Sequence, residues 1–197
     1  MDGKTQTIQS GLSMEFNYES YFTKYKDLAF NDDIHASLDD FKELALKVKT
    51  LDAKMLFAGN GASAAISAHA AVDFTKQAKV RGITFNEADL ITCYSNDYGY
   101  ENWMSEAIKS YYKPNDVVVL TSVSGESPSI VNAAITARKL GLKVVTFSGR
   151  SNSNSLKSHG DINFWVDSNA YNIVECIHMI WVTTVIDAIV GKAEYEV

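Results

Sequence analysis

Cysteine and proline are scarce in this 197-residue chain, which contains two of each. The cysteines, Cys93 and Cys176, form no CxxC pair, so the sequence predicts neither a disulfide framework nor a thiolate zinc site. A reducing, cytoplasmic location is therefore expected. Pro114 is placed in a turn and Pro128 in the first turn of a helix, where the missing N–H costs no hydrogen bond.

Basic runs are absent as well: no run of Lys or Arg exceeds two residues, and the formal net charge is −6. Direct contact with nucleic acid is not expected, and a bound phosphate would be held locally. Each apolar stretch is interrupted every few residues, so no membrane-spanning segment is expected. The polar residues 1–13 lack the apolar core of a signal peptide and are left out of the fold prediction.

The composition is that of a globular protein, with 46% hydrophobic and 21% charged residues. From residue 15 to residue 49, apolar side chains recur at helical spacing with a break at residues 31–33, which predicts two amphipathic helices. We therefore expect a tail and helical arm over residues 1–50 and one domain over residues 51–197.

Short apolar runs then alternate with helical patterns. Strands are predicted at 54–58, 116–121, 143–147 and 162–166, with a weaker one at 90–94, and helices at 63–76, 100–111, 127–140 and 172–190. Because each parallel connection needs a crossover helix, this order predicts an α/β fold with a parallel sheet covered on both faces.

Two Ser/Gly-rich turns follow two of these strands. Residues 59–63 read GNGAS and residues 122–127 read SVSGES, each directly ahead of a predicted helix. In a parallel sheet, ligands gather at the carboxyl ends of the strands, where helix N-termini attract anions. The two turns together predict a phosphate cradle, although each alone is equally typical of turn-forming and helix-capping residues. Neither turn is a Walker A or a GxGxxG motif.

These turns, the segment YSNDYGY at 94–100 and the run ECIH at 175–178 resemble the sugar isomerase (SIS) domain family, and within it the phosphoheptose isomerase branch. The resemblance extends from about Leu38 to Val190. It implies a flavodoxin-like three-layer sandwich with a five-stranded parallel sheet, and a homotetramer whose active sites lie between subunits. It also implies a phosphorylated sugar as ligand, with the phosphate held by Ser63, Ser122, Ser124 and Ser127, beside Gly61.

Aldose–ketose isomerisation moves a proton between adjacent carbons through an enediol(ate), which requires a positioned base. His69 and Asp73 are four residues apart and so share one face of a predicted helix. By resemblance, Asp73 stands where the family has a glutamate that acts as base and, in metal-bound members, as a zinc ligand beside a histidine matching His69.

Two departures from the family pattern concern a late helix. The family has a glutamine matching Glu175 and a catalytic histidine matching Thr183. His178 projects about 140° away from Thr183 around a helix, so a structural role is expected for it. Glu175 could restore a proton-transfer group, or join His69 and Asp73 as a ligand of Zn²⁺; the alternative is an ordinary helix acid.

Three further residues are expected to contact sugar hydroxyls by resemblance, although Asn and Asp are also common in turns: Asn60, Asn96 and Asp97. Two functions compete. The first is a phosphosugar aldose–ketose isomerase similar to sedoheptulose 7-phosphate isomerase, acting on a sugar destined for cell-surface polysaccharide such as lipopolysaccharide or capsule. The second, favoured by Thr183, is a non-catalytic phosphosugar-binding or regulatory protein.

Overall fold

A computed structural model describes residues 15–30 and 33–194, so the polar tail at 1–13 lies outside the described residues. The strands are β1 (Met55–Gly59), β2 (Gly82–Thr84), β3 (Val117–Ser122), β4 (Lys143–Gly149) and β5 (Ile162–Val166). They form one sheet in the order β2-β1-β3-β4-β5, and every neighbouring pair is parallel. This is the flavodoxin-like order, as expected, and its switch point lies between β1 and β3.

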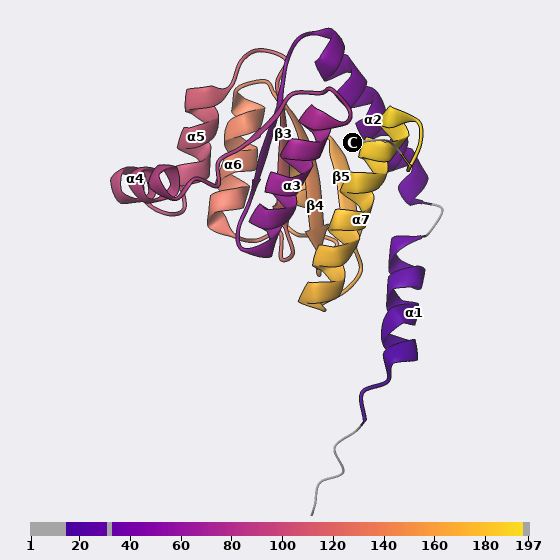
Figure 1. The fold of residues 1–197 in the computed structure, drawn as a ribbon. Coiled ribbons are helices and arrows are strands. Elements are labelled where there is room, and N and C mark those ends of the chain that lie inside the picture. Colours follow the sequence, from indigo (N-terminus) through magenta and orange to yellow (C-terminus); the bar gives the residue numbers. More distant parts are fainter. Residues whose placement is uncertain (1–14, 31–32, 195–197) are drawn as a thin grey trace, which may run out of the picture.

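Helices cover both faces of the sheet (Figure 1). One face carries α2 (Ile34–Thr50), α3 (Ala62–Lys76) and α7 (Tyr171–Val190), and the other carries α5 (Trp103–Tyr111) and α6 (Pro128–Lys139). Alternate strand residues enter opposite layers: Phe57 packs with the first set of helices and Leu56 with the second. The three-layer sandwich is therefore confirmed.

The N-terminal arm is α1 (Tyr18–Ala29), which reaches away from the sheet in Figure 1. Its last residue is tied to α7, because the indole Nε1 of Trp181 donates to the carbonyl of Ala29 at 2.9 Å. By contrast, α2 belongs to the hydrophobic core, where Phe41 is fully buried against Phe74 and Phe164.

The sequence reading was wrong at one edge of the sheet. Residues 90–94, predicted as a weak strand, belong to α4 (Ala88–Tyr98), because Leu90, Ile91 and Tyr94 are spaced to share one helix face. The strand at that edge is β2, which has three half-buried residues and is too short for a periodic pattern. The short 3₁₀ helix η1 (Lys157–His159) precedes β5.

The expectation for apolar segments also needs correction. By length and composition alone, the 20-residue α7 is apolar enough to cross a membrane. A core helix of a globular domain meets the same criteria, and in this fold Ile177, Trp181 and Val185 of α7 pack into the core against the sheet.

Candidate functional site

A cavity of ≈ 140 Å³ lies at the carboxyl ends of β1 and β3. The turns after these two strands and the start of α7 enclose it. Its lining residues are Asn60, Ser63, Thr121, Ser122, Val123, Ser124, Ser127, Tyr171 and Glu175. The structure thus brings the four predicted phosphate-binding serines, Asn60 and Glu175 together in one place.

Two glycines shape the first turn of the cavity. A Cβ on Gly59 would lie 2.5 Å from the backbone carbonyl carbon of Ser63, so only glycine lets β1 turn directly into α3. Gly61 has φ +57 and precedes α3 without a side-chain cap. Gly61 does not line the cavity, but the uncapped N–H groups that follow it suit an anion.

The second turn holds its serine hydroxyls in a useful orientation. Ser122 Oγ accepts the N–H of Gly125 and Ser124 Oγ accepts the N–H of Glu126, both at 3.2 Å. Each oxygen is used as an acceptor, so each hydroxyl proton can be donated to a phosphate oxygen. Ser127 precedes α6 and makes no side-chain cap hydrogen bond. The turn-forming and anion-binding interpretations of these serines are therefore compatible.

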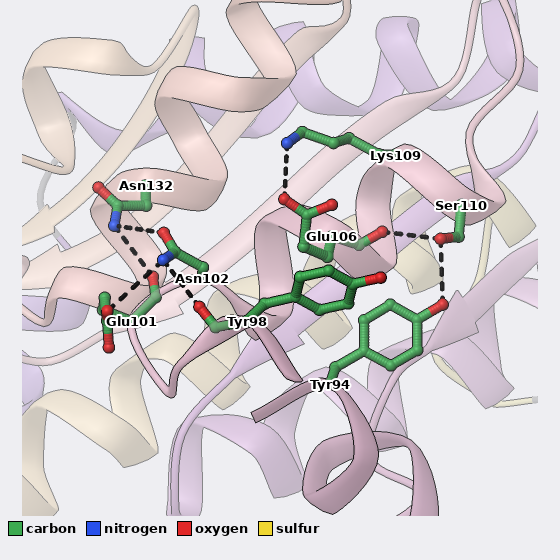
Figure 2. A network of polar contacts seen from close by, with 8 residues as sticks. All are labelled: Tyr94, Tyr98, Glu101, Asn102, Glu106, Lys109, Ser110 and Asn132. Carbon is green, nitrogen blue, oxygen red and sulfur yellow. Dashed lines mark hydrogen bonds and ion pairs between the residues drawn. The ribbon is translucent and has the colours of Figure 1, made fainter. Parts of the chain in front are cut away.

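Asn60 is held from two sides. The Tyr100 hydroxyl donates to Asn60 Oδ1 and Asn60 Nδ2 donates to Ser129 Oγ, both at 3.0 Å. Tyr100 belongs to the turn between α4 and α5, which Figure 2 shows tied to α6. There Asn132 Nδ2 donates to the Glu101 carbonyl at 3.0 Å and to Asn102 Oδ1 at 3.3 Å. These bonds fix the turn that carries Tyr100, and through it the Asn60 amide.

Asn96 and Asp97 are placed elsewhere. Both are exposed on the last turn of α4, where Asn96 Nδ2 donates to Asp97 Oδ1 at 3.0 Å, and neither lines the cavity. Because α4 lies at the rim of the molecule beyond α5 (Figure 1), one chain does not bring these side chains to the cradle. Their role as sugar contacts stays a prediction.

Tyr171 is a cavity residue that sequence reasoning missed. It is the first residue of α7 and directly follows the loop after β5, so the rule that identified the two Ser/Gly turns applied to it as well. No lysine, arginine or histidine is among the described lining residues. An anion in this cavity would therefore be bound by hydroxyls and by the N-termini of α3 and α6.

A second polar centre lies further along α3. His69 Nε2 and Asp73 Oδ2 are 3.1 Å apart, with the His69 side chain 53% exposed and that of Asp73 17% exposed. Asp187 of α7 faces this pair: its burial, and then the charge of Asp73, raise the pKa of the Asp187 carboxyl. Sequence reasoning missed Asp187, although it lies one helical turn after Thr183.

The two centres are separated along the helices. From Ser63 to Asp73 the rise along α3 is about 15 Å, and from Glu175 to Asp187 along α7 it is about 18 Å. Both helices begin at the cavity. Glu175 therefore lies near the cavity in the second turn of α7, whereas Asp187 lies near the far end of α7, beside Asp73. Within residues 15–30 and 33–194, no group of three His, Cys, Asp or Glu residues could hold a metal ion. A Zn²⁺ site of His69, Asp73 and Glu175 is thus not assembled in one chain and stays a prediction.

His178 has the expected structural role. It is fully buried against Phe147 and Trp181, and its Nε2–H donates to the carbonyl of Ser148 at 3.0 Å. Burial lowers the pKa of His178 to about 4. The Thr183 hydroxyl donates within its own helix, to the Met179 carbonyl at 2.8 Å or to the Ile180 carbonyl at 3.1 Å.

The switch-point cavity and its hydroxyl-rich turns define an α/β protein with a site suited to a small anionic ligand at the carboxyl edge of its sheet. Residues 20–149, well over half of the chain, match the model of the SIS domain. The chain belongs to the SIS domain family.

Its similarity to known members is substantial. It is 33% identical to a phosphoheptose isomerase of Akkermansia muciniphila over 132 residues, covering 64% of this chain and 69% of the relative. It is 32% identical to a phosphoheptose isomerase of Roseiflexus sp. over 149 residues, covering 73% and 75% respectively. The solved phosphoheptose isomerase of Neisseria gonorrhoeae shares the fold, with a TM-score of 0.80, 22% identity, and coverage of 87% of this chain and 94% of that one.

Proposed function

We propose that this protein is a phosphosugar aldose–ketose isomerase of the phosphoheptose isomerase kind. The observation that carries the proposal is the arrangement on α3, which begins at the serine-lined cavity and bears the His69–Asp73 pair two to three turns later. The relatives that are 32% and 33% identical to this chain are named phosphoheptose isomerases, which supports a seven-carbon substrate.

In the proposed reaction, the cradle binds the phosphate through the serine hydroxyls and the α3 and α6 N-termini. Asp73 is the base that takes a proton from one carbon of the open-chain sugar and returns it to the next. His69 Nε2, 3.1 Å from Asp73 Oδ2, orients the carboxylate. As an imidazolium, His69 can donate the proton of its other ring nitrogen to the carbonyl oxygen and take back the proton of the neighbouring hydroxyl, which completes the exchange. If Zn²⁺ binds His69, Asp73 and a further ligand, it would polarise the same carbonyl oxygen.

A homotetramer with active sites between subunits is part of the proposal. Among the described residues, Glu175 lines the cavity, whereas His69 and Asp73 lie further along α3 and do not form a metal-binding group with it. Val72, next to Asp73, is 60% exposed, and the arm exposes Tyr18 and Phe22 by 69% and 63%. A second copy that covers these apolar side chains would bring its own polar groups to Asp73.

The proposed setting is cytoplasmic sugar metabolism for a cell-surface polysaccharide such as lipopolysaccharide or capsule. Both cysteines are unpaired and exposed, in keeping with a reducing compartment. The non-catalytic alternative is not favoured, because the relatives carry an isomerase name and the His69–Asp73 pair is intact.

The test is interconversion of sedoheptulose 7-phosphate by the purified protein, followed by NMR, together with a thermal-shift panel of sugar phosphates. We expect turnover and a raised melting temperature with the substrate, because a ligand of the native state adds RT ln(1 + [L]/Kd) to stability. Binding of sedoheptulose 7-phosphate and other sugar phosphates without any interconversion would contradict the isomerase and favour the regulatory protein.

A further inference from the structure

Glu126 is an acid within the phosphate cradle, between Gly125 and Ser127, yet it does not line the cavity. Its carboxylate turns toward the loop at 150–156, which follows β4. Oε1 accepts the backbone N–H of Ser155 at 2.8 Å and Oε2 accepts the Ser155 hydroxyl at 2.6 Å. These two hydrogen bonds lower the pKa of Glu126, so the carboxylate stays charged and bonded at neutral pH.

The loop that presents Ser155 is itself firmly anchored by the neighbouring Asn154. Asn154 is 1% exposed, and its Nδ2 donates to the Ser151 carbonyl at 2.8 Å and to Ser148 Oγ at 3.1 Å. Its Oδ1 accepts the N–H of Lys157 at 2.9 Å. Glu126 is therefore bonded to a loop that is itself anchored at the end of β4.

A second link joins the same two segments at Gly125. The N–H of Leu156 donates to the Gly125 carbonyl at 2.9 Å. Gly125 has φ +66, and a Cβ there would lie 2.1 Å from Asn154 Oδ1, so glycine alone permits this close approach. The cradle is thus bonded to the 150–156 loop at two consecutive residues.

We propose that Glu126 is a positioning residue of the phosphate cradle, which through Ser155 holds residues 122–127 in the binding conformation before the ligand arrives. The Glu126 N–H also donates to Ser124 Oγ, so the position of Glu126 sets the orientation of a predicted phosphate contact. A turn held in advance loses less conformational freedom when the ligand binds, and this strengthens binding. The inference rests on the proposed function in that the ligand carries a phosphate.

The charge of Glu126 has the opposite effect on binding. A carboxylate near a phosphate repels it, so removal of the charge alone would strengthen phosphate binding. Glu126→Gln removes the charge but keeps an oxygen that accepts the Ser155 N–H and an amide that can donate to Ser155 Oγ. Glu126→Ala removes both the charge and the contact. The two variants therefore separate positioning from charge.

The experiment measures binding of inorganic phosphate by isothermal titration calorimetry to the wild type, Glu126→Gln, Glu126→Ala, Ser155→Ala and the Glu126→Ala/Ser155→Ala double variant. Glu106→Ala is the matched control, since Glu106 is an acid on α5 that pairs with Lys109 away from the cavity. We expect Glu126→Ala to weaken binding about tenfold and Ser155→Ala by a smaller factor. The double variant should be no weaker than Glu126→Ala, because both changes break one contact.

Glu126→Gln should bind phosphate as tightly as the wild type or more tightly, and Glu106→Ala should match the wild type. With a sugar phosphate that the protein converts, Glu126→Ala should raise KM and leave kcat unchanged. Wild-type or tighter phosphate binding by Glu126→Ala would overturn the proposal. Should Glu126→Ala fail to fold, Ser155→Ala, which loses one hydroxyl, is used instead. Wild-type or tighter phosphate binding by Ser155→Ala would then overturn the proposal.

Failure of the proposed function gives a different result. Phosphate binding can be measured without turnover. A wild type that binds phosphate but converts no sugar therefore contradicts the isomerase proposal, and the phosphate affinities of the Glu126 variants still test the positioning role of Glu126. A wild type that binds no phosphate overturns both proposals.

Discussion

His69 Nε2 and Asp73 Oδ2 lie 3.1 Å apart on consecutive turns of α3, and Asp187 of α7 faces the same carboxylate. This contact joins the two residues that we propose for proton transfer. It is separate from the serine-lined cavity, so binding of the phosphate and chemistry at the carbons can be tested with different variants.

Asp73→Asn should abolish most of the isomerase activity, because an amide cannot take a proton from carbon. We expect kcat to fall about 10²–10⁴-fold. Binding of inorganic phosphate should be unchanged, since Asp73 does not line the cavity. Steady-state kinetics and calorimetry on the same preparation check this, and equal kcat for variant and wild type would remove Asp73 from the mechanism.

Ser124→Ala should weaken phosphate binding about tenfold, because a hydrogen bond to a charged group is lost. Ser110→Ala is a suitable control, since the Ser110 hydroxyl donates to the Glu106 carbonyl within α5 and Ser110 is not among the cavity residues. Calorimetry with inorganic phosphate provides the comparison. If both variants bind like the wild type, the turn at 122–127 is not the cradle.

Glu175→Gln should separate two effects at one position. The carboxylate lines the anion cavity, so its removal should tighten inorganic phosphate binding by about two- to fivefold through reduced repulsion. If Glu175 also takes part in proton transfer, as its place in the family pattern predicts, kcat should fall in the same variant. Unchanged affinity together with unchanged kcat would show that Glu175 has neither role.

His178 should make the stability of the protein depend on pH. Its pKa is about 4 in the folded chain against an ordinary value of 6.5, so between these values the unfolded chain binds a proton that the folded chain does not. The stability that the protein has with neutral His178 is fully present above pH 6.5 and is lost as the pH falls toward 4. Protonation of this one group in the unfolded chain should lower the free energy of unfolding by about 3 kcal/mol.

Urea unfolding at pH 7 and pH 4.5 measures the effect, with His178→Gln as the comparison because glutamine can still donate to the Ser148 carbonyl. The variant should lose less stability on acidification than the wild type. Identical losses would mean that His178 is not buried in its neutral form.

The cradle could be predicted from sequence because each turn is a local feature. Gly59 marks the position where the chain turns back close to the Ser63 backbone, and Gly125 has the positive φ typical of a turn glycine. The serines follow strands whose carboxyl ends share one edge of the sheet. The same rule, applied to the loop after β5, would have found Tyr171. The strand β2 escaped prediction because three half-buried residues carry no periodic pattern.

The pairing of residues from distant segments could not be predicted. The sequence placed Glu175 with His69 and Asp73 by family pattern alone, whereas the structure separates them along two helices that begin at the same cavity. Asn96 and Asp97 lie between the two cradle turns in sequence, but α4 carries them to the rim of the molecule.

The sequence by itself determined the parallel sheet, the two Ser/Gly-rich turns and the shared helix face of His69 and Asp73, because these depend on periodicity and on spacing within one segment. Only the tertiary structure decided that Asp187 faces Asp73, that Glu126 turns away from the cavity to Ser155, and that Glu175 stays at the cradle. Those relationships depend on how helices and loops far apart in sequence pack on one sheet, which no local pattern specifies.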